Sequence, residues 1–136
     1  MVDPEVKGKV YEPFTMKVEA GKVREFLLAT GNDNPVYQGE EAPVPPTFAT
    51  VFRFWAGGGL EDALQQIGVE MTKVLHGEQE YEYLAPIRVG DTITGTTRIS
   101  DVYSRAGMDF VEFTTQYMNQ RGDAVLNDRA LVIVRE

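Results

Sequence analysis

The chain has 136 residues, a formal net charge of -8 and no cysteine. This length is enough for one hydrophobic core but too short for two, so we expect a single domain over residues 1–136. The negative charge argues against nucleic acid as a partner, because phosphates attract clustered Lys and Arg. No apolar run approaches the roughly 20 residues that a membrane span needs, and residues 1–5 lack the basic and apolar regions of a secretory signal. We therefore expect a cytoplasmic protein that binds a small molecule or another protein, and neither nucleic acid nor a membrane.

The first third of the chain predicts a strand, a helix and an irregular connection. Apolar residues alternate over 9–18, which is typical of a half-buried strand. Over 20–30 they recur three and four residues apart, which indicates an amphipathic helix, and Gly31 supplies a C-terminal stop. The segment 31–46 contains four prolines and is expected to be a loop.

The middle of the chain predicts two further helices. Residues 47–56 are almost all apolar, so a helix there would be buried on most sides. The triple glycine 57–59 ends this helix, and residues 60–67 predict a short second helix that covers the surface.

From residue 69 onward the pattern predicts strands only. Val111, Phe113 and Tyr117 alternate with Glu112 and Gln116, so one face of the sheet is expected to be dry and the other wet. The predicted strands cover 71–75, 78–86, 91–104, 110–119 and 124–135. This order of elements favours an α+β domain in which an antiparallel sheet of about five to six strands wraps around a central buried helix. Free edges of such a sheet favour dimerisation.

Three segments carry a more specific pattern: Asn32–Tyr37, Pro45–Phe48 and Glu78–Asp91. Their order and spacing resemble the hot-dog domains of the MaoC-like dehydratase and enoyl hydratase family. The resemblance is greatest to the N-terminal, FAS1-like dehydratase type and to the non-catalytic subunits of mycobacterial (3R)-hydroxyacyl-ACP dehydratases. It runs over nearly the whole chain and implies a single hot-dog domain that acts on acyl thioesters.

Catalytic members of this family carry the motif Asp-x-Asn-Pro-x-His, and its Asp and His transfer the protons when water is added to a 2-enoyl thioester. The matching positions in this chain are Asn32 and Tyr37. An amide does not titrate, and a phenol with a pKa of about 10 stays protonated near neutral pH. The non-catalytic mycobacterial subunits show the same two replacements, so the resemblance implies that this chain has no catalytic residues of its own.

The resemblance therefore implies a subunit of a heteromeric 2-enoyl-thioester hydratase or (3R)-3-hydroxyacyl dehydratase. A catalytic MaoC-type hot-dog partner would supply the Asp/His dyad in a heterodimer or heterotetramer, while this chain supplies acyl-chain binding. The substrate would be an acyl-CoA or acyl-ACP of fatty acid or steroid metabolism, and no cofactor is implied. An alternative is a homodimeric hot-dog protein that binds acyl thioesters without chemistry.

Residues around the central helix are the candidates for acyl binding. Aromatic side chains there would suit a large flat acyl group, but the same side chains are those that a protein core requires, so plain packing explains them equally well. The candidate substrate-binding residues are Asn34, Pro46, Thr47, Phe48, Val51, Phe52 and Trp55, with Phe54 beside them.

A third possibility is an active homodimeric hydratase that uses His76, the only histidine, together with Asp33 or Glu78. A lone histidine at a strand end is more often a hydrogen-bonding or interface residue, and Asp33 stands in a turn where its side chain can bond its own backbone. Hot-dog thioesterases place a carboxylate near the central helix, and Arg53 is the only charge in 47–56, so that activity is disfavoured. With one histidine and no cysteine, no zinc or iron site is expected.

Overall fold

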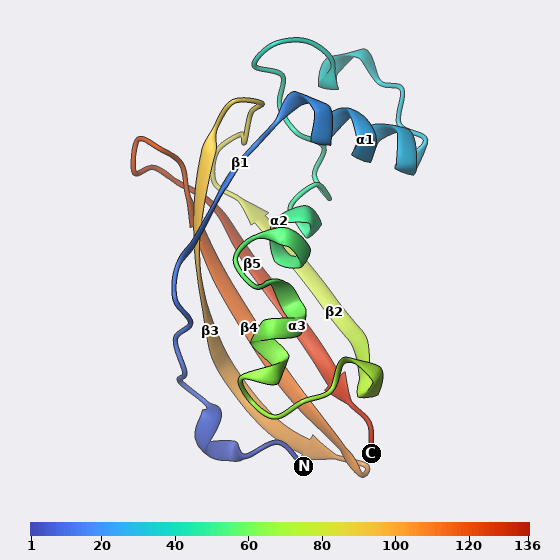
Figure 1. The fold of residues 1–136 in the computed structure, drawn as a ribbon, viewed down its shortest axis with the longest axis vertical. Coiled ribbons are helices and arrows are strands. Elements are labelled where there is room, and N and C mark those ends of the chain that lie inside the picture. Colours follow the sequence, from blue (N-terminus) through green and yellow to red (C-terminus); the bar gives the residue numbers. More distant parts are fainter.

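Five antiparallel strands form one sheet in the computed structural model, which describes residues 1–136 (Figure 1). The strands are β1 (Phe14–Lys17), β2 (Val74–Tyr83), β3 (Thr92–Arg105), β4 (Met108–Met118) and β5 (Ala124–Val134). Their order across the sheet is β1-β3-β4-β5-β2, so β2 and the short β1 are its edges. The predicted antiparallel sheet of five to six strands is thereby confirmed.

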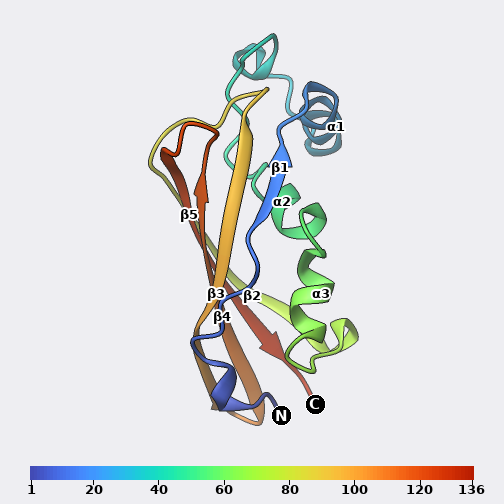
Figure 2. The same cartoon turned by 60° about the vertical axis from the view of Figure 1, so that its left-hand side comes forward.

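Three α-helices lie on the same face of the sheet, as Figure 2 shows from the side. They are α1 (Ala20–Thr30), α2 (Thr50–Trp55) and α3 (Gly59–Gln65), with single 3-10 turns at Pro4–Val6, Pro35–Tyr37 and Met71–Lys73. The helix α1 has the predicted bounds because Gly31 adopts the left-handed conformation, with φ 67°, that ends a helix. None of the helices combines the length and the apolar character that a membrane crossing requires.

The central helix α2 is shorter than the sequence predicts. Residues 47–49 form a turn before the helix begins at Thr50. Phe48 in this turn and Phe52 in the helix are both 1% exposed, and their rings meet edge to face with centroids 5.7 Å apart. The turn and the helix together therefore form the buried centre around which the sheet wraps, as expected.

The edge strand β2 corrects the sequence prediction at one point. The sequence predicted two strands, 71–75 and 78–86, but the structure has a single strand with a shift of register between His76 and Glu78. A side chain on Gly77 would come within 3.1 Å of the Leu131 carbonyl oxygen. Glycine at this position thus lets the neighbouring backbone approach closely, and the strand continues through a bulge instead of breaking.

The connection 31–46 and α1 occupy one end of the molecule, and both chain termini lie at the other end (Figure 1). The start of β2 lies toward the end that holds the termini, far from this connection. Predicted site residues in the connection 31–46 and at the start of β2 therefore lie far apart within one chain.

Candidate functional site

A groove of about 750 Å³ lies between α1 and the connection that follows it. The apolar side of α1 forms one wall, with Val23, Leu27 and Leu28. Asn32 and Tyr37, which the resemblance places at the positions of the family's catalytic pair, both line this groove. The structure therefore brings these two predicted positions together in one concave site.

The turn that carries these two residues is held by its own side chains. The Asn32 Oδ1 atom accepts a hydrogen bond from the Asn34 amide at 3.1 Å, and the Asn34 Oδ1 atom accepts one from the Val36 amide at 3.1 Å. Pro35 stands at the first position of the following 3-10 turn, where a missing N–H does no harm. The side chains of the turn thus hold its backbone in place, with Asn32 and Tyr37 at the positions where the resemblance expects the titrating pair.

Two polar groups in the groove are free to form hydrogen bonds with a bound molecule. The Asn32 Nδ2 group and the Tyr37 hydroxyl make no hydrogen bond within the chain, so both can contact a bound molecule. The carboxylates on the lining belong to the exposed residues Asp33, Glu40 and Glu41, and no histidine lines the groove. Such a site can bind and orient a carbonyl or hydroxyl group, but it lacks the imidazole of an acid/base pair.

His76 lies elsewhere, near the start of β2. Its ring is exposed and sits 3.3 Å from the Gln79 side chain. Glu78, a predicted partner of His76, is ion-paired with Arg129 at 2.9 Å. The other predicted partner, Asp33, belongs to the connection at the opposite end of the molecule (Figure 1). Within one chain, His76 forms an ion pair with neither of its predicted partners.

The candidate acyl-binding residues fall into a buried and an exposed set. Phe48, Val51 and Phe52 belong to a tightly packed core, in which Phe52 also contacts Tyr117 with ring centroids 5.5 Å apart. An acyl chain could reach these three side chains only by opening that core. Trp55, by contrast, is 69% exposed. The exposed members of the set are Asn34, Pro46, Thr47 and Trp55, with Phe54 beside them.

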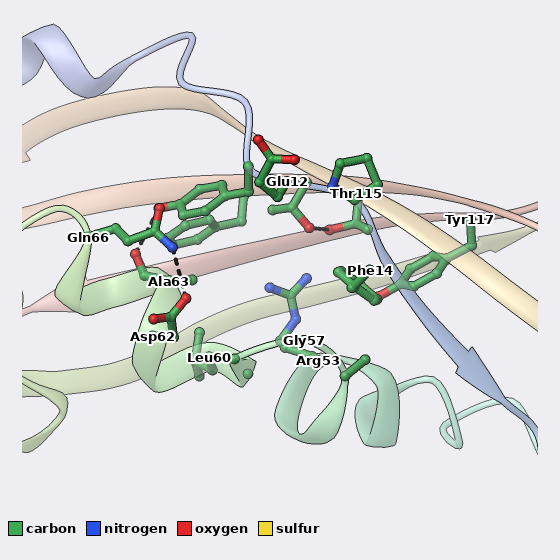
Figure 3. A pocket seen from close by; sticks show the side chains of 17 residues that line it. Glu12, Phe14, Arg53, Gly57, Leu60, Asp62, Ala63, Gln66, Thr115 and Tyr117 are labelled. Atoms are coloured by element: carbon green, nitrogen blue, oxygen red, sulfur yellow. Dashed lines mark hydrogen bonds between the residues drawn. The ribbon is translucent and has the colours of Figure 1, made fainter.

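Polar residues cross the inner face of the sheet in a single row. The register aligns Thr97 with Thr115, Thr115 with Asp128, and Asp128 with Tyr81. The Arg53 side chain of α2 packs against this row (Figure 3), with its Nη2 atom 3.0 Å from the Asp128 carboxylate. We call Thr97, Thr115, Asp128, Tyr81 and Arg53 the polar belt.

The polar belt divides the hydrophobic core into two clusters. One contains Phe48, Phe52 and Leu126, and the other contains Leu64 and Phe113. The belt separates them because its row lies between the row of Leu126 and the row of Phe113 in the sheet register.

Within the belt, Arg53 and Asp128 form a buried ion pair. The side chains of Arg53 and Asp128 are only 10% and 0% exposed, and Gln79 donates a hydrogen bond of 2.5 Å to Asp128. Burial raises the pKa of the Tyr81 hydroxyl, which therefore stays protonated and bonds the Thr50 hydroxyl at 2.9 Å. The sequence analysis did not identify this belt.

Comparison with known proteins assigns the family. The family described as "FAS1-like, dehydratase domain region" matches residues 5–128. The chain therefore belongs to this family, which confirms the resemblance found in the sequence. A UPF0336 protein of Streptomyces avermitilis is 33% identical in an alignment of 145 positions, which covers 98% of this chain and 95% of the relative.

Solved structures confirm the hot-dog fold. The HadBC (3R-hydroxyacyl-ACP dehydratase) complex of Mycobacterium tuberculosis contains a similar chain with a TM-score of 0.82 and 21% identity, covering 94% of this chain and 96% of that one. A MaoC-like dehydratase from Rhodospirillum rubrum has a TM-score of 0.64 and 19% identity, with coverages of 96% and 92%. A chain of the ChsH1-ChsH2 complex of Mycobacterium tuberculosis has a TM-score of 0.69 and 13% identity, covering 96% of this chain and 98% of that one.

Proposed function

We propose that this chain is the non-catalytic subunit of a heteromeric 2-enoyl-thioester hydratase or (3R)-3-hydroxyacyl dehydratase. The observation that carries this proposal is the groove in which Asn32 and Tyr37 replace the family's proton-transfer pair on an intact turn. Because neither side chain can transfer a proton near neutral pH, the Asp/His dyad comes from a catalytic hot-dog partner. This chain contributes part of the acyl-binding surface and stabilises the assembly.

The sheet edges support an assembly of two hot-dog domains. Strand β2 is ten residues long and lies at the edge of the sheet, so one side of its backbone is open to pairing. Leu75 and Leu84, in and just beyond this strand, are 43% and 50% exposed. Two of the similar structures, HadBC and ChsH1-ChsH2, are described as complexes of two different proteins. A partner that pairs with β2 would cover both the free backbone and these leucines.

Only the exposed candidates can contact an acyl thioester without rearrangement of the core. Pro46, Thr47 and Trp55 lie around the two ends of α2, and Lys22 stands 5.5 Å from the centre of the Trp55 ring. A partner domain facing this helix would enclose the acyl group between the two chains. The thioester is acyl-CoA or acyl-ACP, and its acyl group is fatty or steroidal.

The mass of the native complex tests this assignment. The chain is purified under native conditions from the cells that make it, with a tag on its own C-terminus, and the complex is weighed by native mass spectrometry. We expect a heterodimer or heterotetramer whose second chain is a hot-dog protein with an intact Asp-x-Asn-Pro-x-His motif. A complex of this chain alone would contradict the proposal and support the homodimeric binding protein instead.

A further inference from the structure

No α-helix covers the outer face of the sheet, which is the face opposite α1, α2 and α3 (Figure 2). One apolar residue from each of four strands lies on this face, and the register aligns them in a row: Tyr103 of β3, Phe110 of β4, Ile133 of β5 and Leu75 of β2. A valine next to each of them along its strand packs into the core cluster of Leu64 and Phe113. Because successive side chains of a strand point to opposite faces, the four aligned side chains point away from the helices. We call them the outer row.

The outer row is open to solvent. Leu75 and Tyr103 are 43% and 41% exposed, and Phe110 and Ile133 are half-buried. The rings of Tyr103 and Phe110 stack with centroids 4.9 Å apart and planes 2° apart, so they form one flat surface. Gly77 leaves Ile133 uncovered, since a Cβ there would lie 3.1 Å from the Ile133 Cδ1 atom. An apolar row that crosses four strands on a mostly polar face indicates an interaction surface.

Carboxylates flank the outer row on the side toward the middle of the sheet. The next outward-facing residues along the four strands are, in register, Asp101, Glu112, Leu131 and Glu78. Lys7 lies 3.0 Å from Asp101, and Arg129 lies within 2.9 Å of both glutamates. Three carboxylates thus share two cations, and this side of the row keeps a negative charge.

Cations flank the outer row on its other side, toward the end that holds the termini. Arg105 is the next outward-facing residue of β3. The Arg135 amide donates a hydrogen bond of 2.8 Å to the Lys73 carbonyl oxygen, and the register of β4 with β5 places this pair at the level of Arg105. Glu70 and Glu136 share the surface beside Lys73 and Arg135, but none of the three cations forms an ion pair.

This arrangement is self-complementary about a two-fold axis that runs along the outer row. Such an axis places each residue of the row over its own copy and brings the cationic side of one chain over the acidic side of the other. On β3 it opposes Arg105 to the partner's Asp101, and on β2 it opposes Lys73 to the partner's Glu78. Each contact occurs twice, because a two-fold interface repeats every contact. A partner with charge of one sign would complement only one side of the row.

The contact area is small. Three rows on four strands cover about 20 Å by 20 Å, or about 400 Å² on each chain. A typical stable complex buries about 800 Å² on each partner, so this contact is weak by itself.

We propose that two copies of this chain associate through the outer faces of their sheets, with the outer row of one lying on the outer row of the other. The two sheets then stack about 10 Å apart. The contact leaves the backbone edge of β2 and the groove beside α1 free, so it is independent of the proposed function. In the complex proposed above, it joins two heterodimers into a heterotetramer.

Sedimentation velocity of the purified full chain from about 10 µM to about 1 mM measures this association. We expect monomers at the low end and a rising share of dimers toward the high end, because the contact area is small. Tyr103→Ser removes an exposed aromatic ring from the row and is expected to abolish the dimer. Circular dichroism shows whether each variant is folded.

An exchange of charges tests the two-fold geometry. Arg105→Asp places carboxylates opposite each other twice in the dimer and is expected to weaken association about tenfold. Arg105→Asp/Asp101→Arg restores the opposed charges with reversed polarity and is expected to return the affinity to within about threefold of the wild type. Arg121→Asp, in the exposed turn between β4 and β5, changes the net charge as Arg105→Asp does and should leave the association unchanged.

Three results would overturn the proposal. The first is a chain that remains monomeric at about 1 mM. The second is a dimer that Arg105→Asp and Tyr103→Ser leave intact, because such a dimer uses another surface, such as the β2 edge. The third is a double variant that associates as weakly as Arg105→Asp, because charge exchange then fails to re-form the opposed pairs.

Discussion

Removal of the positive charge of Arg53 is expected to destabilise the protein strongly. In Arg53→Met, the Asp128 carboxylate, whose side chain is 0% exposed, keeps Gln79 as a hydrogen-bond partner but loses its counter-charge. An uncompensated buried charge of this kind costs about 3–5 kcal/mol of unfolding free energy. For a chain of this length, such a loss lowers Tm by about 10–15 °C. The double variant Arg53→Met/Asp128→Leu removes both charges and is expected to lie within about 1 kcal/mol of the wild type.

Urea denaturation at one fixed protein concentration, followed by circular dichroism, measures these differences. The exposed Arg105, which makes no ion pair in the structure, provides the control: Arg105→Met should change the stability by less than about 0.5 kcal/mol. A loss of less than about 1 kcal/mol in Arg53→Met, or a double variant as unstable as the single one, would refute the reasoning, because either result means that the two charges are not buried against each other.

Two further predictions concern backbone and pH. Gly59 and Gly107 have similar positive φ angles of 73° and 76°, but a Cβ on Gly59 would lie 2.5 Å from the Phe54 carbonyl oxygen, whereas a Cβ on Gly107 would face open space. Gly107→Ala should lower the free energy of unfolding by about 1 kcal/mol because of its backbone conformation alone. Gly59→Ala should lower it by about 1–3 kcal/mol more because of the added clash, and urea denaturation measures both changes. The hydroxyl of Ser104 bonds Asp109 and is the main cause that lowers the pKa of this carboxyl below its ordinary 3.8. This contribution to stability is therefore complete above pH 3.8 and is lost as the pH falls through the lower, folded-state pKa. In stability measurements from pH 7 to pH 2, Ser104→Ala should be less stable than the wild type at neutral pH and should approach it below pH 3.8, and a constant gap would contradict this assignment.

The alternation of apolar residues predicted most of the fold. Val111, Phe113 and Tyr117 face the core as expected, because a half-buried strand must place one side of its pleat inside. The bulge in β2 could not be predicted, because a glycine such as Gly77 is equally typical of the end of a strand. The close approach of the neighbouring strand, which the sequence does not show, explains why the strand continues through it. The pairing of β2 with its neighbour determines whether the chain breaks or bulges at this glycine, and the alternation of apolar residues carries no information on strand pairing.

The candidate site was predictable in part. The turn from Asn32 to Tyr37 has a local cause, the two Asx hydrogen bonds, and the sequence displays them directly. The polar belt is non-local, because Arg53 and Asp128 meet only through the packing of α2 on β5. One signal was available: Asp128 alternates with the apolar residues of a strand and so falls on the dry face. A charge on that face requires a partner, and Arg53 was the only charge in the central helix.

The hydration of crotonyl-CoA tests the central claim most directly. The rate is measured for the purified chain, for a purified catalytic hot-dog partner, and for the two together, with His76→Ala in place of the wild type as a control. The replacement of the proton-transfer pair by Asn32 and Tyr37 predicts no hydration by the chain alone, a rate in the mixture well above that of the partner, and no effect of His76→Ala. A robust rate by the isolated chain, lost in His76→Ala, would contradict this account and identify the chain as an enzyme in its own right.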